Sequence, residues 1–468
     1  MLENIYGVPM CILAFSILSR YSGCIRMLSS CLTRGLTLAK SVAAIRHISI
    51  FHGRLGRQTV QDVIARLESL TGAQTSFAPQ QSSDRAALER ILPRSQDELP
   101  ARRMSDSYDE AFIPLGSDLK LRDKYINYMG GVRSGRLMED IDVFAVWLCY
   151  RYVLNPKQLP NMPSPFCIVT ALVDRIDFSA HNLKPDADIR LSGKVTYVGT
   201  SSMETTVVLE QLSAGQWQQV TKAEMVMVAR DPLNKGSAVV NPLLAETPEE
   251  VEMVKQGNVN KLRRKQMSEQ SLFKLPPTPS EVALIHQVFI DTVDHGTFRQ
   301  RRPDDALFMS EAKLKNLIIC HPENRNVYGK IFGGYLMRQA LELAYASSLM
   351  YISSGSRPRL THVDDILFRK PVDVGSLLYL LSRVVYTEHN NLQLCVSAEV
   401  VHPRLGTRDL TNVFYFTFSA KEPVKVILPQ TYHEMMMFLD GRRHYQALIG
   451  EKKFYGQADT VEDAHSGM

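Results

Sequence analysis

The chain has 468 residues, of which 45% are hydrophobic and 22% are charged, and its formal net charge is +5. Residues 1–60 hold seven basic residues against one acid, or +6, so the remainder is close to neutral at 5 − 6 = −1. This balance disfavours a nucleic-acid partner. The seven cysteines form no Cys-x-x-Cys pair, which disfavours a zinc site or a disulfide framework.

Residues 1–57 are basic, nearly free of acids and rich in Ser, Leu and Ala, which is typical of a mitochondrial transit peptide. An apolar run at residues 10–18 is too short to span a membrane, but it could be the core of a secretory signal. Met27 could be an internal start. We expect a targeting segment over 1–57, a mitochondrial location and no stable membrane insertion. Residues 58–104 follow as an N-terminal extension that opens with a short amphipathic helix.

The most informative feature is an internal repeat centred on residues 321–346. This stretch predicts a polar loop, a tight corner at Gly333-Gly334 and then a helix with apolar residues at helical spacing. A second copy lies 199 positions earlier. The residues that correspond are Asn127 and Asn326, Gly130 and Gly329, Gly135 and Gly334, Leu137 and Leu336, and Ala145 and Ala344.

The repeat continues downstream, where residues 173–178 correspond to 363–368 at an offset of 190. Strand-like stretches follow in both copies, at 189–197, 202–210 and 220–229, and at 377–386, 392–401 and 410–418. We therefore predict an α+β fold with two repeats, each a long helix wrapped by an antiparallel sheet. The two sheets can join edge to edge and leave clefts between the halves.

These patterns set the expected domain bounds. The first repeat spans 105–232, a linker with a helix spans 233–282, the second repeat spans 283–425, and 426–468 form a C-terminal tail. Thr247-Pro248-Glu249-Glu250 predicts the start of the linker helix, which we expect to run to about Lys265. Its basic end, Arg263-Arg264-Lys265, favours simple placement at a helix C-terminus, with phosphate binding as the alternative.

Two motifs resemble the hotdog-fold acyl-coenzyme A thioesterases with tandem domains. They are Asn326-x-x-Gly329-x-x-Phe332-Gly333-Gly334 before a helix, and Val363-Asp364-x-Ile366-x-Phe368-x-x-Pro371. Supporting stretches include residues 168–174, 200–204, 227–231 and 411–414. The resemblance implies a double hotdog fold and hydrolysis of acyl-coenzyme A to a fatty acid and coenzyme A. It also implies no cofactor or metal, and a homo-oligomer, with a trimer suggested by relatives.

In such thioesterases a helix acid often stands seven residues past the second glycine. Asp142 has that place after Gly135, whereas Leu341 has it after Gly334. The resemblance implies that the loop of each half faces the helix of the other, so that Asn326 meets Asp142. We therefore expect one working site per chain. Asp142 would activate water or attack directly, Asn326 would orient the water or the carbonyl, and the N–H of Gly334 or Gly333 would hold the oxyanion.

Several alternatives stay open for the site. Glu139, Asp140 and Asp142 could form a solvated helix face, and Asp140 is the reserve candidate for the acid. Asp174 and Asp364 follow strands in both copies, which favours a shared structural role. His321 and His362 are isolated histidines, for which a structural role is also favoured.

Three other functions fit the sequence less well than thioester hydrolysis. A hotdog dehydratase needs a histidine beside its acid, and neither predicted helix supplies one. No Gly-x-Ser-x-Gly elbow occurs, which disfavours a serine hydrolase. A non-catalytic protein that binds acyl thioesters or acts as a scaffold remains the main alternative, because fold does not determine function.

Overall fold

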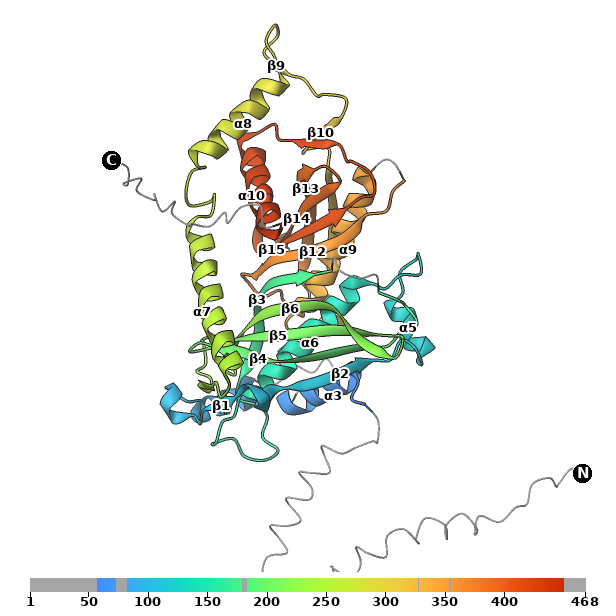
Figure 1. The fold of residues 1–468 in the computed structure, drawn as a ribbon. Coiled ribbons are helices and arrows are strands. Elements are labelled where there is room, and N and C mark those ends of the chain that lie inside the picture. Colours follow the sequence, from blue (N-terminus) through green and yellow to red (C-terminus); the bar gives the residue numbers. More distant parts are fainter. Residues whose placement is uncertain (1–56, 73–81, 179–182, 327, 353–354, 450–468) are drawn as a thin grey trace, which may run out of the picture. The chain divides into compact units, whose positions relative to one another are not determined.

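The computed structural model describes residues 57–72, 82–178, 183–326, 328–352 and 355–449. Within these residues, ten strands form one sheet in the order β11-β13-β14-β15-β12-β3-β6-β5-β4-β2, and every neighbouring pair is antiparallel (Figure 1). The first-repeat strands are β2 Asp109–Ile113, β3 Cys167–Asp177, β4 Ile189–Val198, β5 Ser202–Ser213 and β6 Gln216–Arg230. The second-repeat strands are β11 Lys313–Ile319, β12 Arg359–Phe368, β13 Leu377–Glu388, β14 Asn391–His402 and β15 Thr407–Ser419.

Seven longer helices accompany these strands in the described residues. They are α3 Val60–Thr71, α5 Leu119–Tyr125, α6 Ser134–Tyr152, α7 Pro248–Glu269, α8 Pro279–Thr292, α9 Gly333–Tyr351 and α10 Tyr432–Ile449. The short elements are α4 Ser82–Ala87, β1 Arg102–Arg103 paired with β7 Leu243–Leu244, β8 Val293–Asp294 paired with β9 Arg299–Gln300, and β10 Ala306–Phe308 paired with β16 Val426–Leu428.

The two halves of the sheet join through the strands that correspond in the repeat, β3 and β12. Val363 lies opposite Ile176 and Ile366 lies opposite Val173 in this antiparallel pair. All four side chains are buried. The predicted continuous sheet is therefore confirmed.

Each half of the sheet packs on its own long helix, as predicted. Helix α6 contacts β3, β4, β5 and β6, while α9 contacts β11, β13, β14 and β15. The two helices also contact each other. Phe144 and Leu148 fill the core on α6, and small Ala340 and Ala344 on α9 are fully buried, which lets that helix lie close to its surroundings. These contacts bring the start of each helix beside the other helix.

The linker helix α7 runs beside the strands of the first repeat (Figure 1). Thr247 caps it by accepting a hydrogen bond from the Glu250 N–H at 3.2 Å, as the sequence predicts. The helix continues past the expected end to Glu269, so Arg264 lies within it rather than at its C-terminus. Arg264 donates to Asp174 at 2.7 Å and to Glu204 at 3.1 Å. Neither the helix-end interpretation nor phosphate binding is therefore needed to explain this arginine.

The stretch expected to be a C-terminal tail contains helix α10. Phe438 and Leu439 are buried, and the helix contacts β13, β14 and β15. An ion pair from Arg443 to Glu281, at 2.7 Å, joins α10 to α8. The domain boundary expected at residues 282–283 lies inside α8, because Thr278 and Pro279 begin that helix earlier.

Two sequence-based predictions fall on residues outside the described part of the chain. The targeting segment lies there except for Arg57, and so do residues 450–468 of the predicted tail. Among the described helices, none is both long enough and apolar enough to cross a membrane. The described residues also contain no group of three or more His, Cys, Asp or Glu side chains placed to hold a metal ion.

Candidate active site

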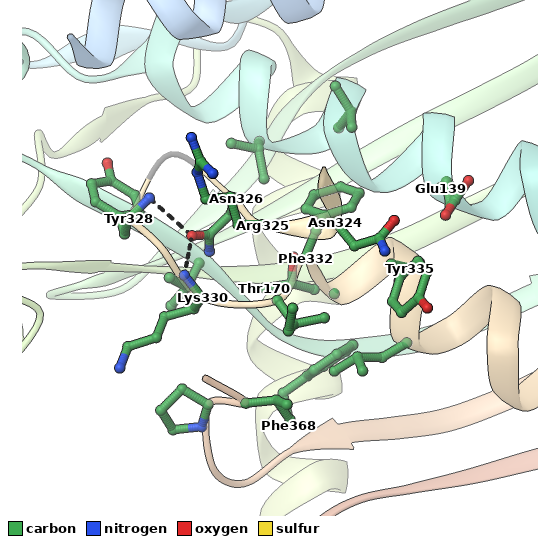
Figure 2. Close-up of a pocket in the computed structure, with 18 of the residues that line it drawn as sticks. Glu139, Thr170, Asn324, Arg325, Asn326, Tyr328, Lys330, Phe332, Tyr335 and Phe368 are labelled. Atoms are coloured by element: carbon green, nitrogen blue, oxygen red, sulfur yellow. Dashed lines mark hydrogen bonds between the residues drawn. The ribbon is translucent and has the colours of Figure 1, made fainter. Parts of the chain in front are cut away.

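A cavity of about 580 Å³ lies between α6, β3 and the loop that precedes α9 (Figure 2). Its apolar lining comes from both repeats and from α3, the helix of the N-terminal extension. Polar groups from the loop and from β3 complete the wall. The lining includes Ile64, Leu67, Val143, Val146, Tyr150, Ile168, Thr170, Asn326, Tyr328, Gly333 and Phe368.

Asp142 lies beside this cavity at the contact between the two repeats. Its side chain is fully buried on α6. Asp142 Oδ2 accepts a hydrogen bond from the backbone N–H of Gly334 at 2.7 Å, and Oδ1 accepts one from the Thr170 hydroxyl at 2.5 Å. Burial raises the pKa of Asp142 to about 7, although both hydrogen bonds oppose that change, and the charge of Glu139 adds to it. The carboxyl group can therefore take up a proton near neutral pH.

The two glycines at the start of α9 lie against Asp142 in different ways. The Gly334 N–H belongs to the first turn of the helix, where backbone donors lack partners within the helix, and it points at Asp142. Gly333 lines the cavity, and a Cβ added to it would lie 3.2 Å from Asp142 Oδ2. The absence of a side chain at Gly333 therefore keeps space between the cavity and the carboxylate.

The neighbouring acids of α6, Glu139 and Asp140, also line the cavity, but each has partners of its own. Asp140, the reserve candidate, is buried and accepts a hydrogen bond from the Tyr125 hydroxyl at 2.6 Å. Burial raises its pKa to about 7 as well. Glu139 accepts a hydrogen bond from Arg338 at 2.8 Å and pairs with Arg136. These acids are buried, so the solvated helix face is excluded.

Asn326 lies in the loop that lines the cavity. Its Oδ1 accepts the backbone N–H groups of Tyr328 at 2.9 Å and Lys330 at 3.1 Å (Figure 2). An atom that receives two N–H donors must be the oxygen of the carboxamide. The group that Asn326 can offer to a ligand is therefore the Nδ2 N–H of its carboxamide, a hydrogen-bond donor. Gly329 has a φ of 72° within this turn, which favours glycine.

Asn127 builds the same turn in the first repeat. Its Oδ1 accepts the N–H groups of Met129 and Gly131, both at 3.0 Å, and Gly130 has a φ of 78°. The second turn therefore repeats the first in backbone conformation. The difference is chemical, because Leu341 stands on α9 where Asp142 stands on α6.

The other acids and histidines that the sequence singles out either have ionisable partners or are exposed. Asp174 is paired with arginines of α7, and Asp364 lies 2.9 Å from Nδ1 of His444 on α10. Each of these acids is thus paired with a basic side chain of a neighbouring helix. His362 lies 3.6 Å from Asp177, and burial lowers its pKa, while His321 is exposed.

Sequence reasoning did not assign a role to Thr170 or Tyr328. Thr170 lies in a stretch that carried the family resemblance, but its contact with Asp142 depends on how β3 passes α6. Tyr328 lies two residues after Asn326, where the first repeat has Met129. A direct comparison of the two copies could have drawn attention to this second position.

Basic side chains also line the cavity. Arg230, Lys330, Arg369 and Lys370 contribute to its wall, and both lysines pair with acids. Lys370 donates to Asp409 at 2.8 Å, and Lys330 pairs with Asp373. Positive charge beside an apolar cavity suits a ligand that combines an anionic part with an apolar part.

The chain is similar to known proteins over most of its length. It is 43% identical over 424 residues to the mitochondrial acyl-coenzyme A thioesterase 9 of Homo sapiens, covering 90% of this chain and 94% of that protein. It is 43% identical over 395 residues to the mitochondrial acyl-coenzyme A thioesterase 10 of Mus musculus, covering 83% of this chain and 89% of that protein. No family model matches the chain.

Similarity to solved structures is lower. An acyl-CoA hydrolase from Staphylococcus aureus, solved in complex with butyryl coenzyme A, coenzyme A and coenzyme A disulfide, is 21% identical in sequence. The match covers 31% of this chain and 92% of that chain, with a TM-score of 0.30.

Proposed function

The chain belongs to the acyl-coenzyme A thioesterase family, and we propose that it hydrolyses acyl-coenzyme A in the cleft that holds Asp142. The observation that carries this assignment is the position of the Asp142 carboxylate. It is buried beside the cavity, held by one backbone and one side-chain donor, and its pKa is raised to about 7. A carboxylate with such a pKa is a suitable general base at neutral pH.

In the proposed reaction, Asp142 removes a proton from water as the water oxygen adds to the thioester carbonyl carbon. Each carboxylate oxygen keeps a lone pair beyond the hydrogen bond that it accepts. The carbonyl oxygen becomes an oxyanion, the carbon–sulfur bond then breaks, and coenzyme A leaves as a thiolate. The proton held by Asp142 passes to that thiolate, so the products are a free acid and a thiol.

The oxyanion needs donors that are aimed at it before the reaction begins. We assign this role to Asn326 Nδ2 and to the N–H of Gly333, the first residue of α9. Both residues line the cavity, and the start of a helix favours negative charge. The N–H of Gly334 serves differently in this proposal, because it donates to Asp142 and orients the base.

We further propose that each chain has one working cleft. Leu341 cannot accept a proton, so the cleft that contains Asn127 has no acid at the corresponding position. The basic residues Lys330, Arg369 and Lys370 would hold the phosphates of coenzyme A. A mitochondrial location and a trimeric assembly also remain proposals, testable by N-terminal sequencing of the protein from mitochondria and by light scattering.

The function is tested by incubating the purified chain with acyl-coenzyme A of several chain lengths. We expect free thiol and free acid to appear in equal amounts. Binding without thiol release at any chain length would replace this function with that of an acyl-thioester-binding or scaffold protein.

A further inference from the structure

The two loop turns share one backbone conformation but differ in how they are fastened to the rest of the protein. In the turn beside Asp142, the Tyr328 hydroxyl donates to the backbone carbonyl of Phe166 at 2.9 Å and contacts the Tyr150 hydroxyl. The Tyr150 hydroxyl accepts the N–H of Ile168 at 3.3 Å. Burial raises the pKa of both tyrosines, so both hydroxyls stay protonated and can donate at neutral pH.

A cation from the N-terminal extension covers the ring of Tyr328. The guanidinium carbon of Arg85 lies 4.9 Å from the centre of that ring. Arg85 is buried, and it donates to the carbonyl of Pro232 at 2.9 Å and to that of Thr71 at 3.2 Å. A cation over an aromatic face is attractive, most strongly where water is excluded. Tyr328 is thus held both at its hydroxyl and at its ring.

The elements that hold Tyr328 also carry the proposed catalytic groups. Tyr150 belongs to α6, the helix of Asp142, and Phe166 immediately precedes β3, the strand of Thr170. Tyr328 itself lies two residues after Asn326. The hydroxyl contacts therefore join the loop of one repeat to the helix and strand that present Asp142 in the other.

The turn of the first repeat is fastened differently, since its exposed Tyr128 interacts with Tyr345 on α9. At the offset of 199, Met129 corresponds to Tyr328 and Leu349 corresponds to Tyr150, and neither side chain has a hydroxyl. Met129 instead accepts a weak hydrogen bond from Tyr345, with 3.9 Å between oxygen and sulfur. The buried pair of Tyr328 and Tyr150, which is bonded to the backbone carbonyl of Phe166, therefore belongs to the turn beside the helix acid.

We propose that Tyr328 and Tyr150 are positioning residues, which hold the Asn326 carboxamide in register with Asp142. The inference rests on the proposed function, since it describes how that site is aligned. Without the hydroxyl of Tyr328, the turn keeps its internal hydrogen bonds but loses its bond to Phe166, just before β3, and its contact with Tyr150 on α6. Small errors in the placement of a catalytic group are costly for the chemical step.

The test compares kcat and KM for acyl-coenzyme A in Tyr328→Phe, Tyr150→Phe and the matched control Met129→Leu. Loss of one hydrogen bond predicts a fall in kcat of about tenfold for each tyrosine variant, with little change in KM. Met129→Leu should keep the wild-type kcat. Near-normal kcat in both tyrosine variants, or a rise in KM alone, would overturn the inference.

A second comparison separates positioning from a general structural role. In an Asn326→Ala background, Tyr328→Phe should cause no further loss of kcat, because the group that it aligns is missing. An equal fold-loss in both backgrounds would contradict the positioning role. Absence of thiol release by wild type would reject the function itself, whereas Asp142-dependent turnover that is insensitive to both tyrosines would reject this inference alone.

Discussion

Gly334, at the start of one repeat helix, donates its backbone N–H to the carboxylate of Asp142 on the other repeat helix at 2.7 Å. This bond crosses 192 positions of sequence and joins the helix of the first repeat to that of the second. The proposed site is therefore formed by both repeats of a single chain.

The first prediction concerns the pH dependence of turnover. Asp142 must be deprotonated to accept a proton from water, and its pKa is raised to about 7. We expect kcat/KM to rise with pH and to level off above an inflection near pH 7. Because the pKa of Asp140 is raised similarly, Asp140→Asn serves as the control and should retain the inflection. A profile that is flat from pH 5.5 to pH 8 would argue against Asp142 as the base.

The second prediction concerns stability. The pKa of Asp142 is higher in the folded protein than its ordinary value of 3.8, so the folded state binds this proton more tightly than the unfolded state. Wild-type stability contributed by this group is thus lost as the pH rises from about 4 to about 7. Asp142→Asn, which carries no charge, should exceed wild type in free energy of unfolding by up to about 4 kcal/mol at pH 8. Denaturant titrations at pH 4.5 and pH 8 test this, and a difference that does not grow with pH would contradict it.

The third prediction uses the two corresponding glycines. A Cβ on Gly334 would lie 2.8 Å from the backbone Cα of Glu139, so Gly334→Ala must force α6 and α9 apart. We expect a loss of about 1–3 kcal/mol in stability and a strong fall in turnover. In Gly135→Ala the nearest atom is Arg338 Cγ at 3.1 Å, on a flexible side chain, so turnover should persist. Equal effects in the two variants, measured by melting and thiol release, would contradict the asymmetry.

The fourth prediction isolates the donor function of Asn326. Asn326→Asp keeps an oxygen that can accept the N–H groups of Tyr328 and Lys330, but it removes the Nδ2 donor. We expect kcat to fall by about a hundredfold or more, the scale for loss of an oxyanion donor. Asn127→Asp makes the same change in the other turn and should leave kcat near wild type. If both variants retain kcat, the donor role of Asn326 is wrong.

Much of the fold could be predicted because the repeat consists of local sequence patterns, which are glycines before each helix and alternating apolar residues in the strands. Gly135 and Gly334 marked two helix starts, and period-two alternation marked the strands that follow each helix. Helix α10 was missed, although Phe438, Tyr445 and Leu448 are buried at helical spacing. The short strands β2 and β11 were also missed, because edge strands carry few alternating apolar residues.

Less of the candidate site could be predicted from the sequence. The spacing after Gly135 singled out Asp142, but its donors depend on tertiary placement. Thr170 reaches it from a strand 28 positions away, and Tyr328 reaches Phe166 across 162 positions. For the same reason the partners of Arg264, which lie 60 and 90 positions away, could not be read from the basic run that contains it.

The most direct test of the central claim is thiol release from acyl-coenzyme A by purified wild type, Asp142→Asn, Asn326→Ala and Asn127→Ala, each checked for folding. Loss of the general base should lower turnover at least about a hundredfold in Asp142→Asn. Asn326→Ala should cost somewhat less, and Asn127→Ala should change little, because Leu341 on α9 stands where α6 has Asp142. Near-normal turnover in Asp142→Asn together with loss of turnover in Asn127→Ala would show that the chemistry occurs in the other cleft.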